Sequence, residues 1–72
     1  MQKRLRDLRE DNDLSQVQVA TLINCTQATY SKYELNKREI PISSLVTLAK
    51  FYNTSVDYLL GLTDVFQPYK RN

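Results

Sequence analysis

The chain has 72 residues, of which 42 % are hydrophobic and 25 % are charged, so it suits one small folded domain and is neither disordered nor fibrous in composition. It has no histidine and a single cysteine, Cys25, which argues against an internal disulfide, a zinc cluster, a cofactor or enzymatic activity. The formal net charge is only +2, and no apolar run approaches the roughly 18 residues that span a membrane, so we expect a soluble, cytoplasmic protein.

Apolar residues recur at helical spacing along the whole chain, and only one glycine and two prolines interrupt the pattern. We therefore predict an all-α fold. In the first helix, Leu5 and Leu8 form the apolar face, while the polar face is mostly basic. We expect this helix to end near Asp11–Asp13.

A second helix is predicted to begin after Ser15. Ser15 and Gln18 form a capping-box pattern, in which each side chain accepts a hydrogen bond from a free backbone N–H group. Val19 and Ala20 share the inward face of this helix. Asn24 tolerates the left-handed conformation that ends a helix abruptly, so we expect the helix to end there.

The third helix is predicted to follow a short link that ends at Thr26, whose hydroxyl can cap it. Tyr30 and Tyr33 form its inward face, and Asn36 can end it as Asn24 ended the second helix. These tyrosines, together with Tyr52, could instead be stacking platforms for single-stranded nucleic acid. Their helical spacing favours packing in the core.

Two more helices complete the predicted domain. Pro41 suits a first helical position, and apolar residues then follow at i, i+3, i+4 and i+7, namely Leu45, Leu48, Ala49 and Tyr52. Ser55 can cap a short fifth helix, and Gly61 can end it. Residues 62–72 show no clear period, so we interpret 1–61 as the domain and 62–72 as a tail.

The second and third helices, joined by a three-residue link, have the pattern of a helix-turn-helix. Ala20 is small where the helices cross, residue 24 can turn left-handed, and Tyr30 can fill the angle between them. The pattern continues in Leu14-Ser15-Gln16, Val19-Ala20, Ser31-Lys32-Tyr33-Glu34, Arg38-Glu39-Ile40-Pro41, Leu48-Ala49 and Asp57-Tyr58-Leu59-Leu60-Gly61. From Leu5 to about Gly61 the sequence thus resembles the Cro and XRE-like phage-repressor family. It departs from that family at Asn24 and Asn36, where glycine is usual, and at Leu22, where a polar residue is common.

This resemblance implies a compact five-helix, lambda-repressor-like DNA-binding domain with a recognition helix, Thr26 to Leu35, in the major groove. The positions that touch bases in the family are occupied here by Gln27, Ala28 and Lys32, and Thr29 and Ser31 could reach bases or phosphates. The implied phosphate contacts are Arg6, Gln16, Thr26, Asn36, Lys37 and Arg38. The resemblance also implies an ion pair between Arg9 and Glu34.

The sequence therefore predicts a regulator that binds double-stranded DNA sequence-specifically, as a repressor and as a homodimer on a palindromic operator. Apolar residues outside the predicted core are candidates for the dimer interface, namely Val65, Phe66 and Tyr69, with Leu22 as a weaker one.

Two alternatives remain open at this point. The first is an antitoxin-type module that binds a protein partner through its tail and also represses its own promoter. The second is a small hydrolase that uses Asp and Glu, which has little support because no paired carboxylates converge in the sequence pattern.

Overall fold

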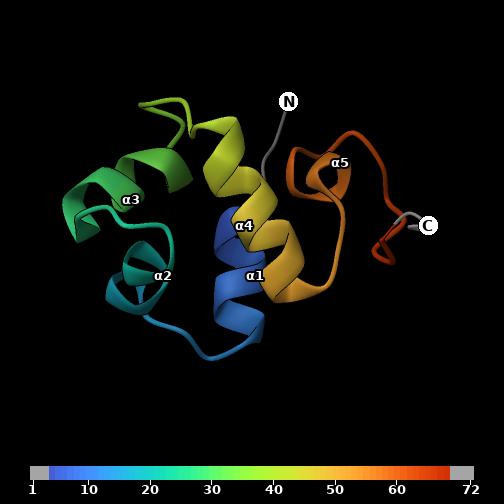
Figure 1. Cartoon of the computed structure of the whole chain (residues 1–72), viewed down its shortest axis with the longest axis horizontal. Helices are drawn as coiled ribbons and strands as arrows, with labels where there is room; N and C mark the ends of the chain where they lie inside the picture. The colour runs from blue at the N-terminus through green and yellow to red at the C-terminus, as the bar shows by residue number, and fades with distance from the viewer. Residues whose placement is uncertain (1–3, 69–72) are drawn as a thin grey trace.

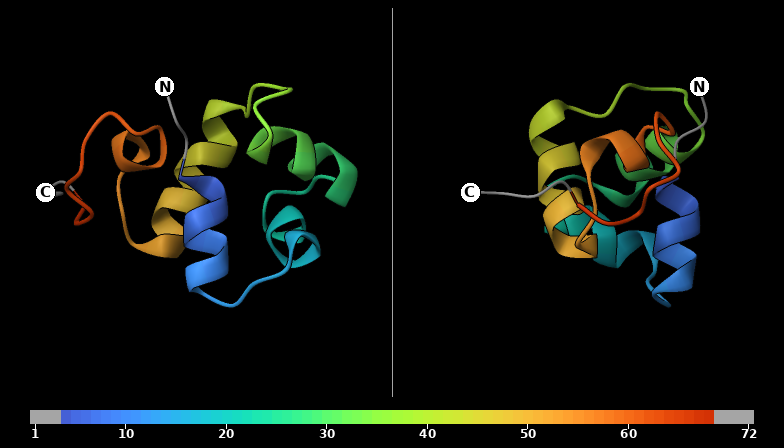
Figure 2. Two further views of the ribbon diagram at one scale, coloured as in Figure 1. Left: turned by 180° about the vertical axis from the view of Figure 1, so that it is seen from behind. Right: turned by 90° about the vertical axis from the view of Figure 1, so that its right-hand side faces the viewer.

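The computed structural model describes residues 4–68, and within them the chain forms five α-helices and no β-strand. The helices are α1 (Leu5–Asp11), α2 (Gln16–Leu22), α3 (Gln27–Glu34), α4 (Ile42–Tyr52) and α5 (Val56–Leu59). Helices α1 and α4 lie in the middle of the molecule, α2 and α3 on one side, and α5 with the residues after it on the other (Figure 1). The view from behind shows the same separation (Figure 2). The predicted all-α architecture is confirmed.

Polar side chains begin three of these helices as the sequence predicted. The Ser15 hydroxyl accepts the N–H of Gln18 at 3.1 Å, and the Gln18 side chain accepts the N–H of Ser15 at 2.8 Å, which completes a capping box. Thr26 accepts the N–H of Thr29 at the start of α3, and Ser55 accepts the N–H of Tyr58 at the start of α5. Each bond satisfies a backbone N–H that has no partner inside its own helix.

Helix α4 begins one residue later than the sequence indicated. Pro41 was expected at the first helical position, but its ψ of 148° is extended and it is the N-cap residue. Its carbonyl accepts the N–H of Leu45 at 3.1 Å, which is the first bond of the helix. The fixed φ of proline suits both positions, so residue type alone did not separate them.

Four non-glycine residues among those described have positive φ, and each lies just after a helix. Asn24 (φ 56°) and Asn36 (φ 59°) confirm the predicted left-handed helix ends. Asp13 and Asn53, both at 56°, were not predicted. Asparagine and aspartate enter this conformation more readily than other residues with a Cβ, which explains why these residues occupy the chain reversals.

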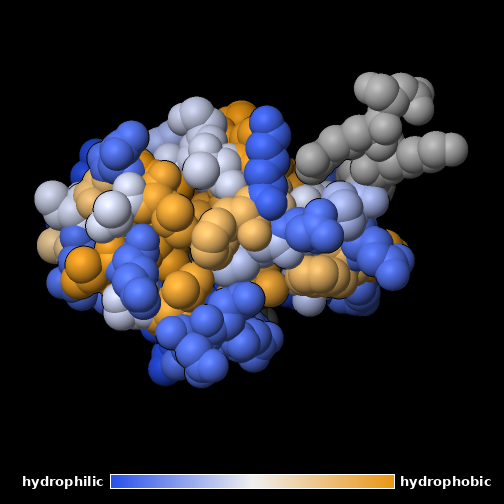
Figure 3. Space-filling model, turned by 60° about the horizontal axis from the view of Figure 1, so that its bottom comes forward, coloured by the Kyte–Doolittle hydropathy of each residue, from blue (hydrophilic) through white to orange (hydrophobic). Residues whose placement is uncertain are grey.

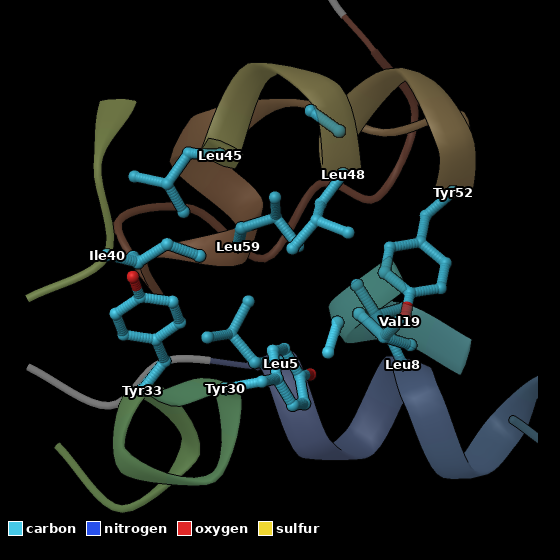
Figure 4. Close-up of a cluster of buried hydrophobic side chains, with 12 residues drawn as sticks. Leu5, Leu8, Val19, Tyr30, Tyr33, Ile40, Leu45, Leu48, Tyr52 and Leu59 are labelled. Atoms are coloured by element: carbon cyan, nitrogen blue, oxygen red, sulfur yellow. The ribbon is translucent and has the colours of Figure 1, made fainter. Parts of the chain in front are cut away.

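The core is formed where all five helices meet (Figure 4). Tyr30 and Tyr33 of α3 are buried, and their rings meet edge to face with centroids 6.4 Å apart. Tyr52 of α4 is buried as well. The tyrosines are therefore core residues and not exposed stacking platforms. The remaining buried apolar residues are Leu5, Leu8, Val19, Ala20, Ile40, Leu45, Leu48, Ala49 and Leu59.

Hydrophobic side chains also reach the surface, among hydrophilic ones, on the face shown in Figure 3. Over the whole described chain the large exposed hydrophobic residues are Val17, Leu22, Leu35, Ile42, Val46, Phe51, Leu62, Val65 and Phe66. No helix within residues 4–68 has the length and apolar character needed to cross a bilayer.

Residues 62–68, which belong to the predicted tail, fold back onto the domain. The buried hydroxyl of Thr54 donates a hydrogen bond to the carbonyl of Phe66. The Phe66 ring packs edge to face on Tyr58 of α5, with centroids 5.3 Å apart. This part of the chain is therefore fastened to the end of the molecule that lies away from α2 and α3 (Figure 1).

Candidate nucleic-acid interface

The link between α2 and α3 sets the angle at which α3 is mounted. Asn24 adopts the left-handed conformation, its N–H donates to Thr21, and the N–H of Cys25 donates to the carbonyl of Ala20 at 3.0 Å. This pair of bonds is a Schellman motif, which reverses the chain tightly after a helix. Ala20 is buried, and because its side chain is only a methyl group it allows the close approach of α3.

The buried tyrosines of α3 leave its opposite face exposed. Gln27, Ala28 and Lys32 all lie on this face and are exposed to solvent. Thr29 and Ser31 are half-buried, and the Thr29 hydroxyl accepts a hydrogen bond from Thr26 at 3.0 Å. Of the predicted base-contacting residues, the structure thus brings three together on one open surface and places two at its edge.

Gln27 and Gln16 are linked in a polar chain that the sequence pattern did not indicate. Nε2 of Gln27 donates to Oε1 of Gln16 at 2.7 Å. Nε2 of Gln16 in turn donates to Oε1 of Glu34 at 3.1 Å. Both glutamines occupy the first position of a helix, and that shared position after a capping residue was the only signal in the sequence.

Glu34 anchors this chain through an ion pair with Arg9. Arg9 Nε donates to Glu34 Oε2 at 2.7 Å and Nη2 donates to Oε1 at 3.2 Å, while Nη1 donates to the carbonyl of Leu14 at 3.0 Å. The side chains of Arg9 and Glu34 are only 14 % and 4 % exposed. The ion pair implied by the resemblance is therefore present, and it joins α1 to the end of α3.

The electrostatics of this pair keep Glu34 ionised. Burial pushes the pKa of the Glu34 carboxyl up, but the hydrogen bonds from Arg9 and Gln16 outweigh it, so the pKa lies below its usual value. The hydrogen bond to Glu34 raises the pKa of Arg9 above its usual value. Because an ionised carboxylate only accepts hydrogen bonds, Gln16 must present its N–H₂ group to Glu34.

A hollow of about 290 Å³ lies where α1, α2 and α3 meet. Its lining residues are Arg6, Arg9, Gln16, Ser31, Glu34 and Leu35. Arg6 is exposed, and its Nε lies 3.4 Å from the Glu10 carboxylate. The Arg9–Glu34 pair is buried whereas the Arg6–Glu10 pair is exposed, so Arg6 is the solvent-facing cation at this hollow.

The turn after α3 carries the remaining predicted phosphate contacts. Asn36, Lys37 and Arg38 are all exposed, and the N–H of Lys37 donates to the carbonyl of Lys32 at 2.9 Å in a second Schellman motif. The turn leads into α4, whose N-cap, Pro41, makes no side-chain cap hydrogen bond. Backbone N–H groups at the start of α4 were not predicted as contacts, although a proline N-cap has no side-chain oxygen to satisfy them.

The predicted dimer-interface residues lie at the other end of the molecule. Val65 is 57 % exposed and Phe66 is 43 % exposed, and both follow α5. Tyr69 lies outside the residues that the structure describes. Leu22, the weaker candidate, is exposed at the end of α2 and is not part of this end.

Two short helices joined by a tight left-handed turn, with the second helix exposed on its outer face, define a helix-turn-helix unit. The chain belongs to the helix-turn-helix family whose model matches its residues 5–59. This match covers α1 to α5 and confirms the family that the sequence motifs indicated.

Several curated proteins are similar to this chain. It is 44 % identical over 62 residues to the uncharacterized HTH-type transcriptional regulator YobD of Bacillus subtilis, covering 86 % of this chain and 55 % of that protein. It is 35 % identical to the HTH-type transcriptional regulator ImmR of Bacillus subtilis, covering 88 % of this chain and 50 % of that protein. It is also 35 % identical to the cryptic phage CTXphi transcriptional repressor RstR of Vibrio cholerae, covering 81 % of this chain and 52 % of that protein.

The chain therefore spans about half the length of the curated relatives it matches. These relatives are named as regulators and not as enzymes, in agreement with the non-enzymatic function predicted from the sequence. No solved structure matches the chain significantly.

Proposed function

We propose that this chain is a DNA-binding domain of a transcriptional regulator that acts as a repressor, recognising a palindromic operator as a homodimer. The observation that carries the proposal is the exposed face of α3, with Gln27, Ala28 and Lys32 mounted on the buried rings of Tyr30 and Tyr33. A face of this kind on the second helix of a helix-turn-helix fits the major groove. The cytoplasmic location expected from the sequence is part of the same proposal.

The three exposed side chains offer complementary chemistry to base edges. Gln27 can bond bidentately to adenine, the methyl group of Ala28 can pack against the methyl group of thymine, and Lys32 can donate to O6 and N7 of guanine. A good bidentate pair discriminates against a wrong base by about 1–3 kcal/mol. Thr29 and Ser31, being half-buried, would contribute at the edge of the groove.

The polar chain behind α3 supports adenine recognition by Gln27 in particular. Glu34 fixes Gln16 with its amide oxygen directed at Gln27, and Gln27 gives one N–H to that oxygen. Gln27 retains its own Oε1 and its second N–H for the duplex. That acceptor and donor match the N6 amino group and N7 of adenine.

The basic and polar residues around α3 would hold the DNA backbone. Arg6 and Gln16 lie on one side of the recognition helix, and Asn36, Lys37 and Arg38 follow its end. Thr26, the N-cap of α3, is proposed as a further phosphate contact. The start of α4 would add backbone N–H groups with a positive helix dipole, which favours an anion.

One domain contacts few base pairs, so useful specificity requires two copies on half-sites about one helical turn apart. The exposed apolar side chains of Val65 and Phe66 support a second copy as their partner, and Tyr69 is proposed to join them. If residues 62–72 instead capture one foreign protein in a fixed stoichiometry, the antitoxin-type alternative would replace this part of the proposal.

Selection of bound sites from a pool of random duplexes tests the division of roles. Lys32→Ala should relax the preference at one base pair. Lys37→Ala, the matched control, should weaken binding to all sequences alike and reduce the salt slope by about one unit. Identical effects of the two variants, or binding that does not depend on salt, would contradict the proposal.

A further inference from the structure

Arg4 lies at the N-terminal boundary of α1, yet its side chain contacts residues close to the other end of the chain. Its Nη1 donates to the carbonyl of Tyr58 at 2.7 Å and to the carbonyl of Thr63 at 2.7 Å. Its Nη2 donates to Oδ1 of Asp64 at 2.6 Å. The backbone N–H of Arg4 also donates to the carbonyl of Leu59 at 2.9 Å. Arg4 is therefore bonded to α5 and to the residues that follow it.

The chemistry of arginine suits this position. Its planar guanidinium has several N–H donors in a fixed arrangement, so one group serves two carbonyls and a carboxylate at once. The guanidinium also lies over the ring of Tyr58, with its carbon 4.2 Å from the ring centroid. The Arg4 side chain is only 22 % exposed, so water competes little for its bonds to the carbonyls of Tyr58 and Thr63, whereas the bond to Asp64 is open to solvent.

The segment that Arg4 holds has no helix of its own and ends in the exposed apolar residues Val65 and Phe66. Phe66 packs on the same Tyr58 ring that the Arg4 guanidinium covers. The Tyr58 ring therefore contacts both the Arg4 guanidinium and Phe66 of the exposed apolar pair. Without Arg4, the segment would lose its bonds at Thr63 and Asp64.

We propose that Arg4 is a positioning residue that holds residues 62–66 against α5 and thereby presets the Val65 and Phe66 surface for a second copy of this chain. The inference rests on the proposed homodimer. Association must order any mobile segment at the interface, and this ordering lowers affinity. A segment that is already held in place in the monomer avoids this loss of affinity. Arg4 therefore strengthens self-association without contacting the second copy.

Arg4→Ala and Arg4→Lys test this role. Lysine keeps the charge but has a single compact ammonium group. It therefore replaces neither the planar set of N–H donors of the guanidinium nor the stacking of that group on Tyr58. Lys50→Ala is the charge-matched control, because Lys50 is an exposed residue of α4. Asp64→Asn is the second control, because the Asp64 side chain is 99 % exposed and an exposed ion pair contributes little.

Two measurements distinguish the position of residues 62–66 in the monomer from the affinity of self-association. Nuclear Overhauser contacts between the Tyr58 and Phe66 rings, recorded at a dilution where the chain is monomeric, report the position of the segment. Sedimentation equilibrium gives the Kd of self-association. We expect both Arg4 variants to lose the ring contacts and to raise this Kd by roughly tenfold. Both controls should keep the ring contacts and stay close to the wild-type Kd.

The proposal is overturned if Arg4→Ala keeps the Tyr58–Phe66 contacts, or if it loses them while self-association stays at the wild-type level. Unfolding of both Arg4 variants, seen as loss of helical circular dichroism, would also overturn it, since Arg4 would then be needed for the whole fold. Failure of the homodimer itself gives a different result: the wild-type chain stays monomeric at high concentration and on a palindromic duplex.

Discussion

Replacing Glu34 by glutamine removes one charge from the buried pair that connects α1, α2 and α3. Glu34→Gln keeps the size of the side chain but leaves the Arg9 guanidinium without its counter-charge. The new amide can donate as well as accept, so Gln16 is no longer forced to present its N–H₂ group to residue 34. We therefore expect two effects, a loss of stability and a loss of base discrimination at the position that Gln27 is proposed to read.

The size of the stability effect follows from the burial of the pair. Removing one partner of a buried ion pair costs about 3–5 kcal/mol. Arg9 retains its bond to the Leu14 carbonyl and some contact with water, so we expect the lower end, about 3 kcal/mol. For a domain of this size that corresponds to a fall in Tm of about 12–24 °C. Glu39→Gln, an equal change of charge at an exposed residue, should leave Tm nearly unchanged.

The pH dependence gives an independent check. The pKa of Glu34 is lowered in the folded protein, so its contribution to stability is present above the unfolded pKa of about 4.3 and is lost as the pH falls through the folded pKa. Thermal unfolding followed by circular dichroism from pH 7 down to pH 2 should therefore show a gap between wild type and Glu34→Gln that narrows below about pH 4.

A double variant separates stability from recognition. Arg9→Met with Glu34→Met replaces the pair by apolar side chains and should recover most of the stability, because no buried charge is left alone. It should not recover discrimination at the Gln27 position, because Gln16 still lacks the carboxylate that orients it. Wild-type Tm and wild-type site selection in Glu34→Gln would refute this reasoning.

Three further predictions concern the fold. The hydroxyl of Tyr52 is buried without a hydrogen-bond partner, so Tyr52→Phe should leave the free energy of unfolding unchanged or raise it by up to about 1 kcal/mol, and a clear fall in Tm would show that the hydroxyl has a partner. Burial raises the pKa of Tyr52 to about 12, so the wild type should lose stability as the pH rises above about 10 and Tyr52→Phe should lose less, as measured by urea titration. Asn53 has φ 56° after α4, so Asn53→Gly should preserve or raise Tm whereas Asn53→Ala should cost about 1 kcal/mol; equal Tm values for the two would contradict the left-handed assignment.

The sequence by itself determined the helices and much of the surface of α3. Ser15, Thr26 and Ser55 cap helices within three residues of their own position, and Asn24 and Asn36 turn the chain at their own φ. Interactions between residues so close in the chain depend only on residue type and spacing, so they can be predicted from the sequence pattern. The wrong prediction at Pro41 has a local cause as well, because the fixed φ of proline suits both the N-cap and the first helical position.

Tertiary structure alone decided which polar side chains act together. The hydrogen bonds that join Gln27, Gln16 and Glu34 cross from α3 to α2 and back, and those of Arg4 reach Thr63 and Asp64 at the other end of the chain. Such partners meet only because the packed helices bring distant residues to one place, and no residue spacing encodes that distance. Sequence thus specified the exposed face of α3 that we propose as the recognition surface, and packing specified what orients that face and what holds the segment after α5.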